Sequence, residues 1–79
     1  MYYVYILHSI NFNQNYTGFT KDLKTRLIDH NAGRSKHTKK YKPWKLVAYT
    51  AFENESRARC YEEYLKTGSG IAFTKRHII

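Results

Sequence analysis

Two tyrosine-bearing segments near the start of the chain, with a polar stretch between them, constrain the fold most strongly. Residues 2–7 (Tyr-Tyr-Val-Tyr-Ile-Leu) and 16–20 (Tyr-Thr-Gly-Phe-Thr) are rich in the aromatic and β-branched residues that strands favour. The stretch between them, residues 11–15, is polar and turn-prone. This pattern predicts an antiparallel hairpin that places Tyr5 and Tyr16 on adjacent strands.

The middle of the chain predicts one helix and one strand. Residues 22–31 indicate a helix with Thr20 as its cap, and apolar residues at helical spacing give it a buried side formed by Leu23 and Leu27. The run Asn31-Ala32-Gly33 is typical of a helix end. Residues 44–52 predict a third strand, which the chain enters through Pro43.

Two C-terminal helices complete the predicted fold. The first is capped by Asn54 or Ser56 and runs to about Thr67, with a buried face formed by Ala58, Tyr61 and Leu65. Gly68 and Gly70 are expected to break it. Residues 71–79 then predict a short closing helix that would cover the sheet with Ile71, Phe73 and Ile78.

Length and cysteine usage narrow the class of protein. A chain of 79 residues lies below the usual ~100–200 residues per domain, so we expect a single domain over residues 1–79. The single cysteine, Cys60, cannot form an intramolecular disulfide and is expected to be a small packing residue. We find no secretory signal, and the longest apolar stretch, residues 2–7, is too short to cross a bilayer. We therefore expect a cytoplasmic protein with no membrane partner.

Positive charge is concentrated in one segment. The formal net charge is +8, and from Arg34 to Lys45 the chain carries basic residues but no acidic one. Such a cluster neutralises phosphates and releases counterions, so it favours a nucleic acid as partner. Two alternatives stay open. One is attraction to an anionic membrane, although no flanking apolar face accompanies the cluster, and the other is a basic loop that merely faces solvent.

Two common types of site are not indicated. The four histidines and Cys60 lack the paired spacing that is typical of structural zinc. The run Gly68-Ser69-Gly70 follows a predicted helix and has no accompanying lysine signature, which argues against a nucleotide-binding phosphate loop.

Three side chains on the predicted helices could carry chemistry. Glu62 lies at the border of the buried face, where it suits a hard divalent cation; an ion pair with Arg59 or Lys66 is the alternative. On the first helix, Arg26 and His30 lie one turn apart near the leucine stripe. Arg26 could instead cover the core with its aliphatic stem.

In combination, these residues resemble the GIY-YIG nuclease superfamily, and above all its small stand-alone bacterial proteins related to the N-terminal nuclease domain of a bacterial excinuclease. Tyr3-Val4-Tyr5 stands where the family has Gly-Ile-Tyr, and Tyr16-Thr17-Gly18 stands where it has Tyr-Ile-Gly. Arg26 and His30 follow at the family's spacing, and residues 58–70 resemble the glutamate helix of the subgroup. The chain departs from the family in having Tyr3 in place of the first glycine and no asparagine after the glutamate helix.

The resemblance implies an α/β (α+β) fold with a mixed three-stranded sheet surrounded by helices, and phosphodiester hydrolysis with one divalent ion, Mg²⁺ or Mn²⁺. It gives the metal to Glu62 and the stabilisation of transition-state charge to Arg26. Tyr5, with Tyr16, or else His30 would position or deprotonate the attacking water, and the residues leave this choice open. The basic segment would hold nucleic acid, with two aromatic rings for base stacking; the set is Arg34, Lys36, Lys39, Lys40, Lys42, Tyr41 and Trp44.

The expected activity is therefore that of a metal-dependent endonuclease acting on DNA in preference to RNA. We expect it to be weakly sequence-specific or structure-selective, and to work as a monomer or weak homodimer. The first alternative is a non-catalytic nucleic-acid-binding module that keeps the fold, which the missing asparagine favours. The second is an interaction or structural protein whose basic surface is incidental. Metal-dependent cleavage separates the enzyme from the binding module, and phosphate-sensitive binding separates both from the third class.

Overall fold

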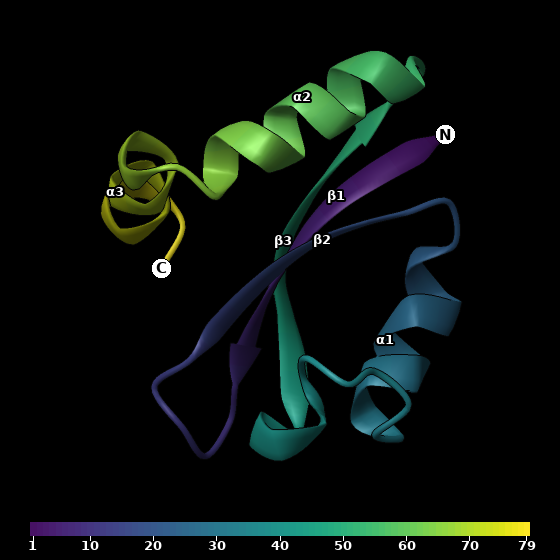
Figure 1. The fold of residues 1–79 in the computed structure, drawn as a ribbon, viewed down its shortest axis with the longest axis vertical. Helices are drawn as coiled ribbons and strands as arrows, with labels where there is room; N and C mark the ends of the chain where they lie inside the picture. The colour runs from purple at the N-terminus through teal and green to yellow at the C-terminus, as the bar shows by residue number, and fades with distance from the viewer.

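A computed structural model describes residues 1–79 and shows a three-stranded sheet with helices on both sides (Figure 1). The strands are β1 (Tyr2–Ser9), β2 (Asn15–Thr20) and β3 (Trp44–Phe52), in the spatial order β2-β1-β3. The helices are α1 (Leu23–Asn31), α2 (Glu55–Leu65) and α3 (Gly68–His77), and a short 3-10 helix, η1, spans Lys39–Tyr41. No helix combines the length and apolar character that a membrane crossing needs. The predicted α+β fold with a helix-covered three-stranded sheet is confirmed.

Both strand pairings are antiparallel. The resemblance implied a mixed sheet, so this part of the prediction is wrong. β1 and β2 form the predicted hairpin, in which Tyr5 lies opposite Gly18 and Leu7 lies opposite Tyr16. β3 pairs with the other side of β1 and makes β1 the central strand. This position explains why the consecutive residues from Val4 to Leu7 are all buried, since both faces of the strand are covered.

The side chains of β1 alternate between two separate apolar clusters. The cluster on the α2 side comprises Val4, Ile6, Ala58 and Leu65. The cluster on the α1 side is largely aromatic and comprises Tyr5, Leu7 and Trp44, with Leu23 and Leu27 of α1 packed against it. The predicted buried faces of the first two helices are therefore confirmed, and the tyrosine-bearing face of the sheet is the one that α1 covers.

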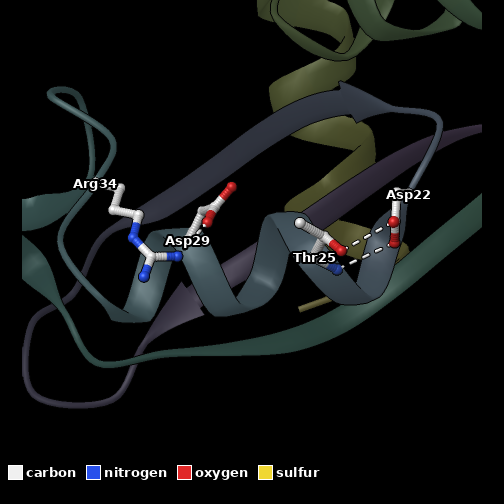
Figure 2. Close-up of polar contacts among 4 residues, drawn as sticks. All are labelled: Asp22, Thr25, Asp29 and Arg34. Atoms are coloured by element: carbon white, nitrogen blue, oxygen red, sulfur yellow. Dashed lines mark hydrogen bonds and ion pairs between the residues drawn. The ribbon is translucent and has the colours of Figure 1, made fainter.

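The start of α1 differs from the prediction. Asp22, not Thr20, caps the helix, because its carboxylate accepts hydrogen bonds from both the backbone N–H and the hydroxyl of Thr25 (Figure 2). Thr20 accepts a hydrogen bond from the Asp22 backbone N–H instead. The predicted end is confirmed: Ala32 is the C-cap, and Gly33 follows at a φ of 77°, a value that favours glycine.

The C-terminal helices also differ from the prediction, in where they begin and in which residues they bury. Asn54 caps α2, as one of the two predicted caps, whereas Thr67 caps α3, so that the glycines after it form the first turn of α3. Phe73 and Ile78 pack against the α2-side cluster, but Ile71 is 48% exposed, contrary to the prediction. Cys60 is exposed as well, so its expected packing role is wrong.

Candidate active site

The Tyr5 side chain crosses the edge strand β2 at Gly18. Tyr5 and Gly18 are paired across the hairpin and face the same side of the sheet, and a Cβ built on Gly18 would overlap the Tyr5 ring. Only glycine leaves room for the ring at this point. The Tyr5 ring is therefore the group that approaches the backbone closely at Gly18.

Tyr5, His30 and Thr38 form a buried hydrogen-bonded chain. The Tyr5 hydroxyl lies 2.8 Å from Nε2 of His30, and Nδ1 of His30 lies 2.6 Å from the Thr38 hydroxyl. All three side chains are buried. With the proton on Nδ1, His30 donates to Thr38 and accepts from Tyr5. The neighbouring Arg26, which has donors only, favours this tautomer because the Tyr5 hydroxyl then directs its proton at His30. The indole N–H of Trp44 donates to the Thr38 carbonyl at 2.8 Å and holds Thr38 in place.

Burial controls the protonation of this pair. Burial lowers the pKa of His30, the positive charge of Arg26 lowers it further and Asp29 opposes the shift, so the imidazole is neutral near pH 7. Burial also raises the pKa of the Tyr5 hydroxyl, although Arg26 partly opposes this shift. A protonated phenol therefore faces a neutral imidazole that can accept its proton.

Arg26 approaches the same hydroxyl from α1. It lies one turn before His30 and is half-buried. Interaction with the Tyr5 hydroxyl is the main cause that raises the pKa of Arg26, although the two groups do not meet in the geometry of a full hydrogen bond. No carboxylate forms an ion pair with the guanidinium. Its N–H donors are thus available for an anion, which a residue that only covers the core would not need.

Tyr16 packs beside this pair from β2. Its ring centroid lies 5.1 Å from that of His30 and 6.3 Å from that of Tyr5. The Tyr16 side chain is half-buried, in contrast to Tyr5. The structure therefore brings Tyr5, Tyr16, Arg26 and His30 together, with Tyr16 on the side open to solvent.

Glu62 lies on α2 and influences the site through its charge. Only 18% of its side chain is exposed, and its carboxylate lies 3.1 Å from Nζ of Lys66. The ion pair with Lys66 is one of the two that the sequence left open, whereas Arg59 pairs with Glu55. The negative charge of Glu62 raises the pKa of the Tyr5 hydroxyl, and this effect is smaller than those of burial, Arg26 and Tyr16. The carboxylate is therefore within electrostatic reach of the Tyr5 hydroxyl.

Comparison with known proteins decides the family. Residues 1–72 match the family described as the GIY-YIG catalytic domain. The chain belongs to the GIY-YIG family. This family is one of nucleases, so the chain carries a nuclease-type domain, and the predicted likeness to small stand-alone bacterial members is confirmed.

Similar GIY-YIG proteins occur in several bacteria. A UPF0213 protein of Staphylococcus haemolyticus is 39% identical over 69 residues, which cover 86% of this chain and 83% of that protein. A UPF0213 protein of Streptococcus pyogenes serotype M3 is 38% identical over 65 residues, which cover 81% of this chain and 70% of that protein. The solution NMR structure of a UPF0213 protein from Bacillus halodurans superimposes with a TM-score of 0.58 and 31% identity, covering 95% of this chain and 82% of that one.

The donor set of this GIY-YIG domain fits a weakly held, hard cation. No group of three or more His, Cys, Asp or Glu side chains comes together, so a divalent ion would take at most two protein ligands of these types. Mg²⁺ binds in this way, keeping several waters and taking its other oxygens from substrate phosphates. Glu62, which is little exposed and whose charge raises the pKa of the Tyr5 hydroxyl, is the carboxylate that fits.

Most of the predicted nucleic-acid-binding residues of the GIY-YIG chain are exposed: Arg34, Lys36, Lys39, Lys40 and Lys42. Arg34 also forms an ion pair with Asp29 at 2.8 Å (Figure 2). Trp44 is only 4% exposed and packs in the α1-side cluster, so the prediction that it stacks on bases is wrong. Tyr41 is half-buried with its ring centroid 5.4 Å from that of Phe12, so η1 packs against the β1–β2 loop.

Two positioning residues were missed in the sequence. Thr38 completes the buried chain at His30, as described above. Asn31 accepts a hydrogen bond from the Trp44 backbone N–H at 2.6 Å and donates to the Trp44 carbonyl at 3.0 Å, which joins the end of α1 to the start of β3. Asn31 was marked in the sequence only as part of the helix-end run Asn31-Ala32-Gly33, and Thr38 had no such signal.

Proposed function

We propose that this GIY-YIG protein is a divalent-metal-dependent endonuclease that hydrolyses phosphodiester bonds in DNA, with weak sequence specificity or selectivity for DNA structure. One observation carries the proposal. The hydroxyl of Tyr5 is hydrogen-bonded to a neutral imidazole at 2.8 Å, and a guanidinium and a carboxylate lie within electrostatic reach of it. A base, a phosphate-binding cation and a metal-binding group are the three parts that this hydrolysis needs.

Tyr5 and His30 act together as the base. The raised pKa of Tyr5 disfavours a free phenolate at neutral pH, so Tyr5 alone is a poor base. When Tyr5 takes a proton from the attacking water, its own proton passes to Nε2 of His30 along the 2.8 Å hydrogen bond. The imidazolium that forms keeps its Nδ1–H directed at Thr38. In this relay Tyr5 faces the water and His30 stores the proton.

Arg26 and Glu62 manage the charge of the phosphate. The Arg26 guanidinium, which stays protonated, donates to non-bridging phosphate oxygens and stabilises the charge that develops on them. Its charge also stabilises negative charge on the Tyr5 oxygen during the proton transfer, since Arg26 lowers the pKa of Tyr5. Glu62 would hold Mg²⁺ or Mn²⁺, and the ion, when bound, neutralises the phosphoryl and leaving oxygens.

The exposed basic segment binds the nucleic-acid strand. It offers five exposed cations between Arg34 and Lys42, whereas Tyr41 is half-buried and Trp44 is in the core. Contacts to phosphates carry no sequence information directly. Weak sequence specificity follows from this composition.

A cleavage assay tests the proposal. Labelled branched, flapped, single-stranded and duplex DNA, and a matching RNA strand, are incubated with Mg²⁺, with Mn²⁺ or with a chelator. We expect cleavage of DNA that requires the metal and falls by at least about 100-fold in Arg26→Gln, as for other preorganised charge-stabilising groups. Arg57→Gln, on the exposed side of α2, is the matched control and keeps the wild-type rate. Salt-sensitive binding without cleavage of any substrate would overturn the proposal in favour of a non-catalytic binding module.

A further inference from the structure

A cavity of about 250 Å³ lies between the start of β2, the end of α2 and α3. Figure 1 shows that α3 follows α2 and lies beside its C-terminal end. The residues that matter for its chemistry are Tyr16, Thr17, Leu65, Lys66, Ile71 and Lys75. None of them has a role in the hydrolysis described above, although Tyr16 packs beside the His30 ring.

The cavity adjoins the candidate active site through two of these residues. Tyr16 contributes to the cavity, and its ring also packs 5.1 Å from the His30 ring. Lys66 contributes to the cavity, and its ammonium lies 3.1 Å from the Glu62 carboxylate. A ligand in the cavity would therefore lie next to the site where the phosphate reacts.

The lining combines apolar surface with two cations. Leu65, Ile71 and Tyr16 are the hydrophobic residues of the lining, and no carboxylate lines the cavity. Lys66 and Lys75 supply the positive charges. An ammonium has three donors, so Lys66 can hold a phosphate oxygen while it still contacts Glu62. This combination suits a ligand with a flat apolar part and an anionic part, as a nucleotide has.

Size and access limit which nucleotides can enter. The volume of about 250 Å³ lies below the ~300–1,000 Å³ of typical ligand pockets, so it fits one nucleotide unit and no duplex. A paired base is stacked inside its duplex and must first be extruded, at a cost of about a few kcal/mol that is smallest for an already single-stranded base. The cavity therefore discriminates in favour of unpaired strands.

We infer that this cavity binds a single unpaired nucleotide of the nucleic-acid strand beside the phosphate that is cleaved. Lys66 and Lys75 hold the phosphate of that nucleotide, and its base and sugar pack against Leu65, Ile71 and Tyr16. The inference rests on the proposed function, because only a nuclease site gives a role to a cavity beside it. It deepens that function by naming the substrate class: DNA with a single-stranded segment or a flap.

A metal-free titration tests the inference directly. Thymidine 5′-monophosphate is added to ¹⁵N-labelled protein, with thymidine, inorganic phosphate and uridine 5′-monophosphate as separate arms. We expect the largest amide shifts at the residues that line the cavity, with binding about tenfold tighter than for thymidine or phosphate alone. Comparable affinity for the uridine nucleotide would extend the ligand class to RNA, and weaker affinity would restrict it to DNA.

Two variants show whether the cavity is the site. Ile71→Trp fills the cavity and should abolish the shifts, and Lys75→Gln should weaken binding about tenfold. Ile28→Trp is the matched control, because Ile28 is 53% exposed on α1 and Ile71 is 48% exposed on α3. The ¹⁵N spectrum of each variant verifies that it is folded. Shifts confined to the basic segment, or unchanged binding by Ile71→Trp, would overturn the inference.

The titration separates this inference from the proposed function. It contains no metal and measures no cleavage, so binding in the cavity without cleavage contradicts the proposed function alone. Metal-dependent cleavage without binding in the cavity contradicts the inference alone. If both hold, Ile71→Trp lowers cleavage of flapped DNA relative to the Ile28→Trp control.

Discussion

The Tyr5 hydroxyl lies 2.8 Å from Nε2 of His30, although 25 positions separate the two residues in the sequence. Two features of the fold create this contact. Gly18 lets the Tyr5 ring cross β2, and Asn31 joins the end of α1, where His30 lies, to β3. Because the central strand β1 and the end of α1 are both held in place, Tyr5 and His30 are preorganised for proton transfer.

Removal of the Tyr5 hydroxyl should stop the relay. Tyr5→Phe keeps the ring, so we expect DNA binding to persist while the single-turnover cleavage rate falls by about 10²–10⁴-fold. Leaving Nε2 of His30 unpaired in the interior should also lower the free energy of unfolding by about 1–3 kcal/mol. Tyr3→Phe, two positions earlier on β1, is the matched control. Equal rates for the two variants would show that Tyr5 does not act on the water.

Gly18, in the Tyr16-Thr17-Gly18 motif, is expected to be required because it leaves room for the Tyr5 ring. In Gly18→Ala the new methyl group would overlap the Tyr5 ring and force it away from His30. We expect a loss of about 1–3 kcal/mol in the free energy of unfolding, measured in urea, together with a loss of cleavage. Gly68→Ala is the control, since a Cβ at Gly68 meets nothing within 4 Å. If Gly18→Ala had the same free energy of unfolding as the wild type, this would contradict the crossing of β2 by the Tyr5 ring.

His30 should make the protein less stable in acid. Burial lowers the pKa of His30 below the value of about 6.5 that it has when unfolded, so the unfolded chain binds this proton first as pH falls. The stability that neutral His30 contributes is therefore present above about pH 6.5 and is lost as pH falls from there through the pKa of the folded state. Urea unfolding between about pH 8 and pH 5 measures this decline.

Two histidine variants separate His30 from other groups that titrate in this range. His30→Gln removes the titrating group, so the decline in unfolding free energy below about pH 6.5 should flatten. His37→Gln, on the exposed loop before η1, is the matched control and should retain it. A decline of equal size in both variants would assign the pH dependence to residues other than His30.

Lys66 should compete with a metal ion for Glu62. Its ammonium lies 3.1 Å from the Glu62 carboxylate, and a divalent ion must displace it or share the carboxylate with it. The pair is exposed on the Lys66 side, so Lys66→Met should tighten Mn²⁺ binding by only about twofold. Paramagnetic broadening of amide signals near Glu62 during an Mn²⁺ titration measures the affinity. Arg59→Met, which breaks the ion pair with Glu55, is the control, and an equal effect there would reject the competition.

The strands and helices could be predicted because local patterns specify them. Aromatic and β-branched runs around a polar turn predicted β1 and β2, and apolar residues at helical spacing predicted the buried faces of α1 and α2. Helix starts were less predictable. Thr20 and Asp22 are both good capping residues, and only the path of the chain after β2 makes Asp22 the one whose carboxylate meets the free N–H group.

Residues of the site that depend on tertiary packing could not be predicted in the same way. Thr38 lies in a loop rich in cations, where one small polar residue has no periodicity to mark it as buried. Trp44 lies in the same basic stretch, so the sequence indicated a base-stacking ring. The fold turns its ring into the α1-side cluster because Asn31 fixes its backbone and Thr38 accepts its indole N–H.

One comparison tests the central claim most directly: the single-turnover rate of flapped-DNA cleavage in Mg²⁺ by Glu62→Gln and by Glu63→Gln. The two substitutions are chemically identical and adjacent on α2, but Glu63 is exposed whereas Glu62 is little exposed and acts on the Tyr5 hydroxyl. We predict that Glu62→Gln loses at least about 100-fold in rate while Glu63→Gln matches the wild type. Equal rates for the two variants, or cleavage that persists without metal, would contradict a metal-dependent active site at Glu62.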